Sequence, residues 1–188
     1  NSVLAVFGSL IVVFLYILIR FRKWQFSLGA VAAVFHDVLI VLGIFSITYK
    51  FMPFNMEINQ AFIAAILTVI GYSLNDTVVV FDRIREGLKN QRGAQDAVMN
   101  NAINSTLLRT IITSVTTLLT VISLFIFGGP ALQDFSFAII IGVLVGTYSS
   151  IFVASPFVAY WAKRRGINLR REILDAEQEI VESPATTN

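Results

Sequence analysis

Three ionisable side chains, Asp37, Asp76 and Arg109, lie inside stretches of the chain that are otherwise apolar enough to cross a membrane. Even mild scales assign a cost of about 2.5 to 3.5 kcal/mol to an Asp or Arg at the centre of a spanning helix. Such residues therefore tend to face the interior of a helix bundle, to pair, and to mark the path of an ion or substrate. Their placement predicts transport chemistry.

The composition predicts an all-α polytopic membrane protein. Of the 188 residues, 56% are hydrophobic and only 14% are charged, with a mean hydropathy of +0.75, far from the balance of a soluble domain. Cysteine is absent, which excludes a disulfide framework, Cys-ligated zinc and a thiol nucleophile. With His36 as the single histidine, no histidine-rich metal site is expected.

Five apolar segments are each close to the roughly 20 residues that a helix needs to span about 30 Å of hydrocarbon. We expect a transmembrane bundle over residues 1–162 with a connector at 82–105 and a charged tail at 163–188. The expected spans are 3–19, 26–49, 60–81, 106–127 and 135–162.

The distribution of Lys and Arg predicts the orientation. Five crossings place the basic turn at 20–23, the connector and the tail on one side, with twelve of the fourteen basic residues, whereas Lys50 stands on the other. The positive-inside rule then makes the connector and the C-terminus cytoplasmic and puts the N-terminus outside. Because the chain begins without Met or the basic flank of a signal peptide, we expect it to be the C-terminal part of a longer protein.

Asp76 and Arg109 are the candidate proton-conducting residues. Asp76 lies six residues, about 9 Å of helix rise, inside Asp82, which we place at the membrane boundary. Arg109 lies similarly deep in the next segment, and two helices joined by a cytoplasmic connector run antiparallel, so the two side chains could meet. The carboxyl can exchange between its protonated and ionised forms, while the Arg stays charged. A static ion pair that holds two helices together is the alternative.

Further polar residues are candidate accessories, namely His36, Asp37, Asn75, Thr110 and Thr113. Neighbouring residues of a helix point about 100° apart, so one of His36 and Asp37 could face Asp76 while the other bonds elsewhere. An accessory relay and a structural polar pair are equally open.

Two periodic patterns predict how helices meet. The threonines at 106, 110, 113, 117 and 120 share one helix face, which could line a water path or bond back to the helix's own carbonyls. Gly142 and Gly146 are four residues apart and predict close helix packing.

The run from Gly71 to Glu86, GYSLNDTVVVFDRIRE, resembles the signature of SecF, the smaller membrane subunit of the bacterial SecDF protein-export factor, or of the SecF half of a fused SecDF. His36-Asp37, Arg109-Thr110 and Phe127-Gly128-Gly129-Pro130 match the same family in order and spacing.

This resemblance implies a resistance, nodulation and division (RND) type bundle, of which the chain holds helices two to six without the first helix and the periplasmic domain. It implies a multi-pass protein of the bacterial inner membrane that uses the proton motive force to assist preprotein translocation, with protons as coupling ion and no other cofactor. The implied partners are SecD, the SecYEG channel, SecA, the translocating preprotein and membrane lipid, and no nucleic acid. Asp76 and Arg109 match the family's transmembrane acid and arginine, and its second acid comes from SecD.

Two alternatives use the same residues. An intramembrane aspartyl protease needs two membrane carboxylates, and Asp37 with Asp76 could form that dyad, although the Gly-x-Gly-Asp context of such proteases is missing. The second alternative is another RND-type proton-coupled exporter, but the run at 71–86 matches such exporters poorly.

Overall fold

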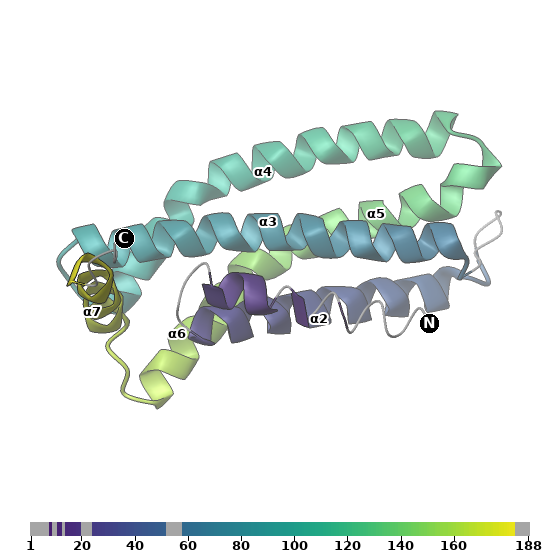
Figure 1. Ribbon diagram of the computed structural model, residues 1–188. Coiled ribbons are helices and arrows are strands. Elements are labelled where there is room, and N and C mark those ends of the chain that lie inside the picture. The colour runs from purple at the N-terminus through teal and green to yellow at the C-terminus, as the bar shows by residue number, and fades with distance from the viewer. Residues whose placement is uncertain (1–7, 9–10, 13, 20–23, 52–57, 183–188) are drawn as a thin grey trace, which may run out of the picture.

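The computed structural model describes residues 8, 11–12, 14–19, 24–51 and 58–182. Within these residues all regular structure is helical (Figure 1), which confirms the all-α class. The helices are α2 (Trp24–Thr48), α3 (Gln60–Asn90), α4 (Gln95–Phe127), α5 (Pro130–Ser149), the π-helix η1 (Ser150–Ala154), α6 (Ser155–Arg164) and α7 (Leu169–Glu182).

Within the described residues, four helical stretches are long and apolar enough to cross a membrane, as expected of a multi-pass membrane protein. They are Trp24–Thr48, Gln60–Asn90, Gln95–Phe127 and Pro130–Arg164. The first expected span, 3–19, falls largely outside the described residues, as do the basic turn at 20–23 and positions 52–57 of the following loop; the described residues at 11–12 and 14–19 are helical.

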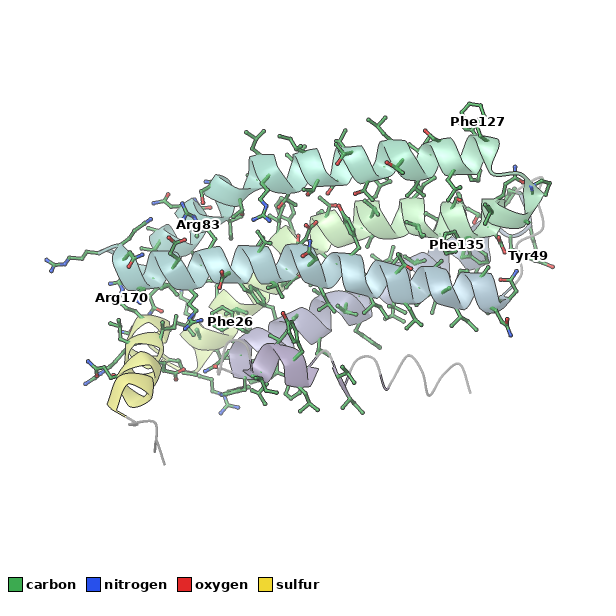
Figure 2. All side chains as sticks on the ribbon, turned by 45° about the horizontal axis from the view of Figure 1, so that its top comes forward. Phe26, Tyr49, Arg83, Phe127, Phe135 and Arg170 are labelled. Atoms are coloured by element: carbon green, nitrogen blue, oxygen red, sulfur yellow. The ribbon has the colours of Figure 1, made fainter. Side chains whose placement is uncertain are left out.

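The spanning helices run alongside one another between two chemically different ends (Figures 1 and 2). We call the end that holds the α3–α4 connection and α7 the basic end, where Arg83 and Arg170 lie in Figure 2. The opposite end, where α4 passes into α5 through Gly128 and Gly129, is the turn end. Gly129 has φ of 75° and Pro130 opens α5, positions that suit a residue without Cβ and one without an N–H.

A buried acid that the sequence analysis did not single out joins two helices at the turn end. Asn59 caps α3 by accepting the Phe62 N–H at 2.9 Å, and its amide donates to Asp134 Oδ2 at 2.9 Å. Asp134 is only 5% exposed, and its other oxygen accepts the Phe135 N–H at 2.7 Å. The pair fixes the start of α3 against the first turns of α5.

The connector expected at 82–105 does not form a separate segment between two helices. Instead, α3 continues to Asn90 and α4 begins at Gln95, so only 91–94 are non-helical. The reason is that the buried stripe of α3 continues past its apolar stretch: Ile84 and Leu88, one turn apart, are both 0% exposed.

The expected charged tail at 163–188 contains α7, which docks on the basic end. Leu169 is buried, and Arg170 donates to the carbonyls of Leu88 at 2.9 Å and Gln91 at 2.7 Å. These carbonyls lie at the end of α3, where no N–H of that helix can reach them. Thus α7 completes the end of α3 and belongs to the folded domain.

The last span is interrupted by η1 between α5 and α6, a feature that the apolar pattern did not reveal. Pro156 follows directly and has no N–H for the carbonyl one turn before it. The five-residue π-turn accommodates this loss, and Ser155 Oγ donates to the Ser150 carbonyl at 3.2 Å. Such π-turns frequently occur at functional sites.

Both glycines of the predicted packing seam lie against α3. A Cβ on Gly142 would collide with the side chain of Val69, and one on Gly146 would come within 3.1 Å of Ser73 Cβ. In contrast, α4 is peripheral: 11% of its most apolar stretch is buried, compared with 39% to 50% in the other three spans. Therefore α3 and α5 form the tightly packed centre, and α4 leaves most of its surface uncovered.

This close approach predicts that Gly142→Ala destabilises the protein by about 1 to 3 kcal/mol, the usual cost of overpacking. Gly71→Ala on α3 is the matched control, because nothing lies within 4 Å of a Cβ there. The unfolding midpoint in detergent should fall for Gly142→Ala alone, and Val69→Ala should restore it. Equal midpoints for the two glycine variants would contradict the packing.

Candidate functional site

A polar layer separates two hydrophobic clusters in the middle of the bundle. On α3 the cluster near the turn end finishes at Ile70, and the one near the basic end resumes with full burial at Val80. Between them α3 carries four polar residues that face neighbouring helices, namely Tyr72, Ser73, Asp76 and Thr77. Within the described ranges, no group of three or more His, Asp or Glu side chains could hold a metal ion.

Asp76 is buried in this layer without a hydrogen bond to one of its oxygens. The residue is 5% exposed, and Oδ2 finds no partner among the described residues. The hydroxyl of Thr77, which is 0% exposed, is equally unpartnered within the same ranges. A buried carboxylate without donors is costly, so Asp76 suits a role in which its proton or its environment changes.

Arg109 stands at the level of Asp76. The hydroxyl of Tyr72 donates to Ser114 Oγ at 3.1 Å, which fixes the register of α3 against α4. From this contact Asp76 lies four residues and Arg109 five residues toward the basic end, about 6 and 7.5 Å of helix rise. The antiparallel pairing expected from the connector therefore brings the two residues to matching depth.

The predicted contact between these charges is nevertheless not formed. In the described part of the chain no ion pair joins Asp76 to Arg109. The reason is that Arg109 projects from the uncovered side of α4 and is exposed, whereas Asp76 is enclosed by the bundle. Asp76 and Arg109 therefore share a depth in the bundle but make no direct contact.

Asp37, which the sequence predicts to be an accessory residue, makes three side-chain hydrogen bonds in this layer. Its Oδ2 accepts the hydroxyls of Ser73 at 2.5 Å and Ser149 at 2.7 Å, and Oδ1 lies 3.2 Å from Nδ1 of His36. Of the two interpretations left open for His36 and Asp37, this contact fits the structural polar pair, in which Asp37 also bonds to other helices. The side chain of Asp37 reaches α3 and α5, and the half-exposed His36 ring turns back to it.

A second chain of hydroxyls crosses the same layer. Ser114 accepts from Tyr72 and lies 2.6 Å from Thr147 Oγ1, which joins α3, α4 and α5. The first network, centred on Asp37, joins α2, α3 and α5. Together the two networks connect the four spanning helices that the described residues contain.

The remaining candidates do not reach Asp76. The hydroxyl of Thr113 bonds to the carbonyls of Arg109 and Thr110, and other threonines of the stripe likewise bond to their own helix. The structure thus favours backbone bonding over a lined water path. Asn75 is exposed, and Thr110 is buried with its carbonyl accepting from Ser114.

Sequence reasoning missed the residues that build the two networks, namely Tyr72, Ser73, Ser114, Thr147 and Ser149. A weak signal was available, because hydroxyl residues recur within five positions of Asp76 and within four of Gly146. Single hydroxyls are common in spanning helices, however, and their partners become visible only once three helices are placed.

Comparison with known proteins places this chain in a recognised family. A family model described as "Protein export membrane protein SecD/SecF, C-terminal" matches residues 1–164. Protein translocase subunit SecF of Rhodothermus marinus is 61% identical over 159 residues, which cover 84% of this chain and 51% of that protein. Protein translocase subunit SecF of Thermodesulfovibrio yellowstonii is 54% identical over 166 residues, 87% of this chain and 53% of that protein.

Fused proteins and a solved structure match as well. Protein translocase subunit SecDF of Brucella abortus is 44% identical over 177 residues, which cover 94% of this chain and 22% of that protein. A crystal structure of SecDF in a super-membrane-facing form superposes with a TM-score of 0.78 at 45% identity, covering 87% of this chain and 22% of that one. The chain thus spans about half the length of the SecF relatives.

The hydroxyl contact that sets the register is testable by a double-mutant cycle on Tyr72→Phe and Ser114→Ala. Interhelical hydrogen bonds in membranes average about 0.6 kcal/mol and reach about 1.7 kcal/mol, so a coupling in that range is expected from unfolding in detergent. Thr113→Ala is the matched control, because its hydroxyl bonds to its own helix. A coupling with Tyr72→Phe as large for Thr113→Ala as for Ser114→Ala would refute the contact.

Proposed function

Because the chain belongs to the SecD/SecF family of protein-export membrane proteins, we propose that it is the membrane part of a SecF-type subunit that uses the proton motive force to assist preprotein translocation. Asp76 is the proton-exchanging group, and Arg109 is the fixed charge beside it. The named relatives are translocase subunits, and neither alternative is favoured by them.

The observation that carries the proposal is the state of Asp76. It lies in the family-like run at 71–86, is 5% exposed, and leaves Oδ2 without a partner in the described residues. A proton can neutralise such a carboxyl when no donor does, and its loss restores a charge that attracts Arg109. Protonation therefore changes the force between α3 and α4, which is the step that coupling requires.

The exposed side of α4 supports a partner that covers Arg109. On the same helix as Arg109, Leu108 is 70% exposed, Ile112 is 53% exposed and, farther along, Leu119 is 61% exposed. Lipid can cover the apolar groups but not the cation at this depth. We place SecD, or the SecD half of a fused protein, on this face, where the family's second acid would meet Arg109.

The proposal also covers the membrane, the partners and the coupling ion. Export in the bacterial inner membrane implies the SecYEG channel, the SecA ATPase and the translocating preprotein as partners, with lipid around the bundle and protons as the coupling ion in place of a cofactor. The cluster of Arg and Lys at the basic end supports a cytoplasmic C-terminus by the positive-inside rule. The first described residues then lie toward the periplasmic side.

The protease alternative has a specific obstacle in the structure. A catalytic aspartyl dyad shares a proton between two adjacent carboxyls. Here both oxygens of Asp37 are occupied by Ser73, Ser149 and His36, and no hydrogen bond links Asp37 to Asp76 in the described ranges. The two acids belong to different surroundings.

The proposal predicts that Asp76→Asn in the full-length subunit, assembled with its partner, removes the part of preprotein export that depends on the proton motive force. Asn matches Asp in shape but cannot release a proton. Export into membrane vesicles would be measured with and without a proton gradient. Asp96→Asn, at an exposed carboxylate near the basic end, is the control and should export normally.

A gradient-dependent increment of wild-type size in an assembled Asp76→Asn complex would rule out the proposed role. Equal losses for Asp76→Asn and Asp96→Asn would also contradict it, since only the first residue is buried in the membrane layer.

A further inference from the structure

Asp37 holds α3 through a hydroxyl that lies one helical turn before Asp76. Asp37 is 1% exposed, and the 2.5 Å contact joins its Oδ2 to Ser73 Oγ. Ser73 is completely buried, and residues three apart on a helix are neighbours on its surface. A force on Ser73 therefore acts directly on the turn that presents Asp76.

The rotation of α3 is fixed on two sides at this turn. Gly146 of α5 lies so close to Ser73 that a Cβ there would stand 3.4 Å from the Ser73 Cα. On the other side, Tyr72 donates to Ser114 of α4. Contacts of Tyr72 with α4 and of Ser73 with α2 and α5 therefore restrict the rotation of the helical turn that leads to Asp76.

We propose that Asp37 is a positioning residue for the proton site: it fixes the rotation of α3 so that Asp76 is presented toward Arg109, and it carries no proton itself. The proposal rests on the proposed function, since it assigns to Asp37 the preorganisation of Asp76.

The hydrogen bonds of Asp37 distinguish a residue that positions Asp76 from a residue that carries a proton. What the site requires of residue 37 is one oxygen that accepts from both Ser73 and Ser149, and a second atom that pairs with Nδ1 of His36. An Asn side chain meets all three requirements: its oxygen accepts both hydroxyls, and its NH2 donates to Nδ1 when the imidazole proton is on Nε2. A proton carrier could not be replaced in this way.

The test compares Asp37→Asn, Asp37→Leu and Ser73→Ala in the full-length subunit assembled with its partner. Thr68→Ala is the matched control on α3, because its hydroxyl is exposed and bonds to the Ala64 carbonyl. Gradient-dependent export is normalised to the amount of assembled complex. Labelling of Asp76 by dicyclohexylcarbodiimide at one pH is quantified on its peptide by mass spectrometry.

Asp37→Asn and Thr68→Ala should stay within about twofold of the wild type in both measurements, because the hydrogen bonds that orient α3 are kept. Asp37→Leu should lower export by about tenfold or more, the scale on which small misplacements act. Ser73→Ala should lower it about threefold, as expected for one interhelical bond, and both should change the labelling of Asp76. If Asp37→Leu does not assemble, Ser73→Ala carries the comparison.

Loss of gradient-dependent export in Asp37→Asn, to the level of Asp76→Asn, would overturn the proposal by making Asp37 a carrier. Wild-type labelling of Asp76 in both Asp37→Leu and Ser73→Ala would also overturn it, because a merely structural role changes the yield of complex but not the reactivity of Asp76 within it. If Asp76→Asn itself exports normally, the proposed function fails, while the labelling still reports whether Asp37 orients Asp76.

Discussion

A carboxylate inside a membrane must find hydrogen-bond donors or give up its charge, and this constraint organises the middle of the bundle. Asp37 meets it with two hydroxyls and an imidazole from its own and neighbouring helices. Asp76, one turn beyond one of those hydroxyls, has an oxygen with no donor in the described residues. The two aspartates therefore suit different roles: Asp37 joins helices, and Asp76 can exchange a proton.

The packing of the helices gives the two acids their different surroundings. Small residues of α5 let α3 approach closely, so that Ser73 can reach Asp37 and Gly146 can contact Ser73. By comparison, α4 packs on α3 near the basic end through Val98 and Ala102 and is joined to α3 and α5 by the Tyr72–Ser114–Thr147 chain, whereas its apolar stretch is largely uncovered. The acid thus lies in the buried part of the bundle, and the arginine lies on its exposed side.

The sequence predicted the features that depend on composition and spacing along one helix. Apolar length predicted the four spans that the described residues contain, and the geometry of the connector predicted that Asp76 and Arg109 lie at one depth. Features that depend on three helices at once were not predictable: the donors of Asp37, the outward direction of Arg109, and the docking of Arg170 on the end of α3. The π-turn before Pro156 was missed because hydropathy carries no information on backbone hydrogen bonding.

The most direct test of the account is infrared difference spectroscopy of the assembled complex between two pH values, read in the carbonyl stretching band of protonated carboxyl groups. The account predicts a membrane-buried band that is lost in Asp76→Asn and retained in Asp37→Asn. A band that persists in Asp76→Asn and vanishes in Asp37→Asn would show that the proton resides on Asp37, and would contradict the division of roles between the two acids.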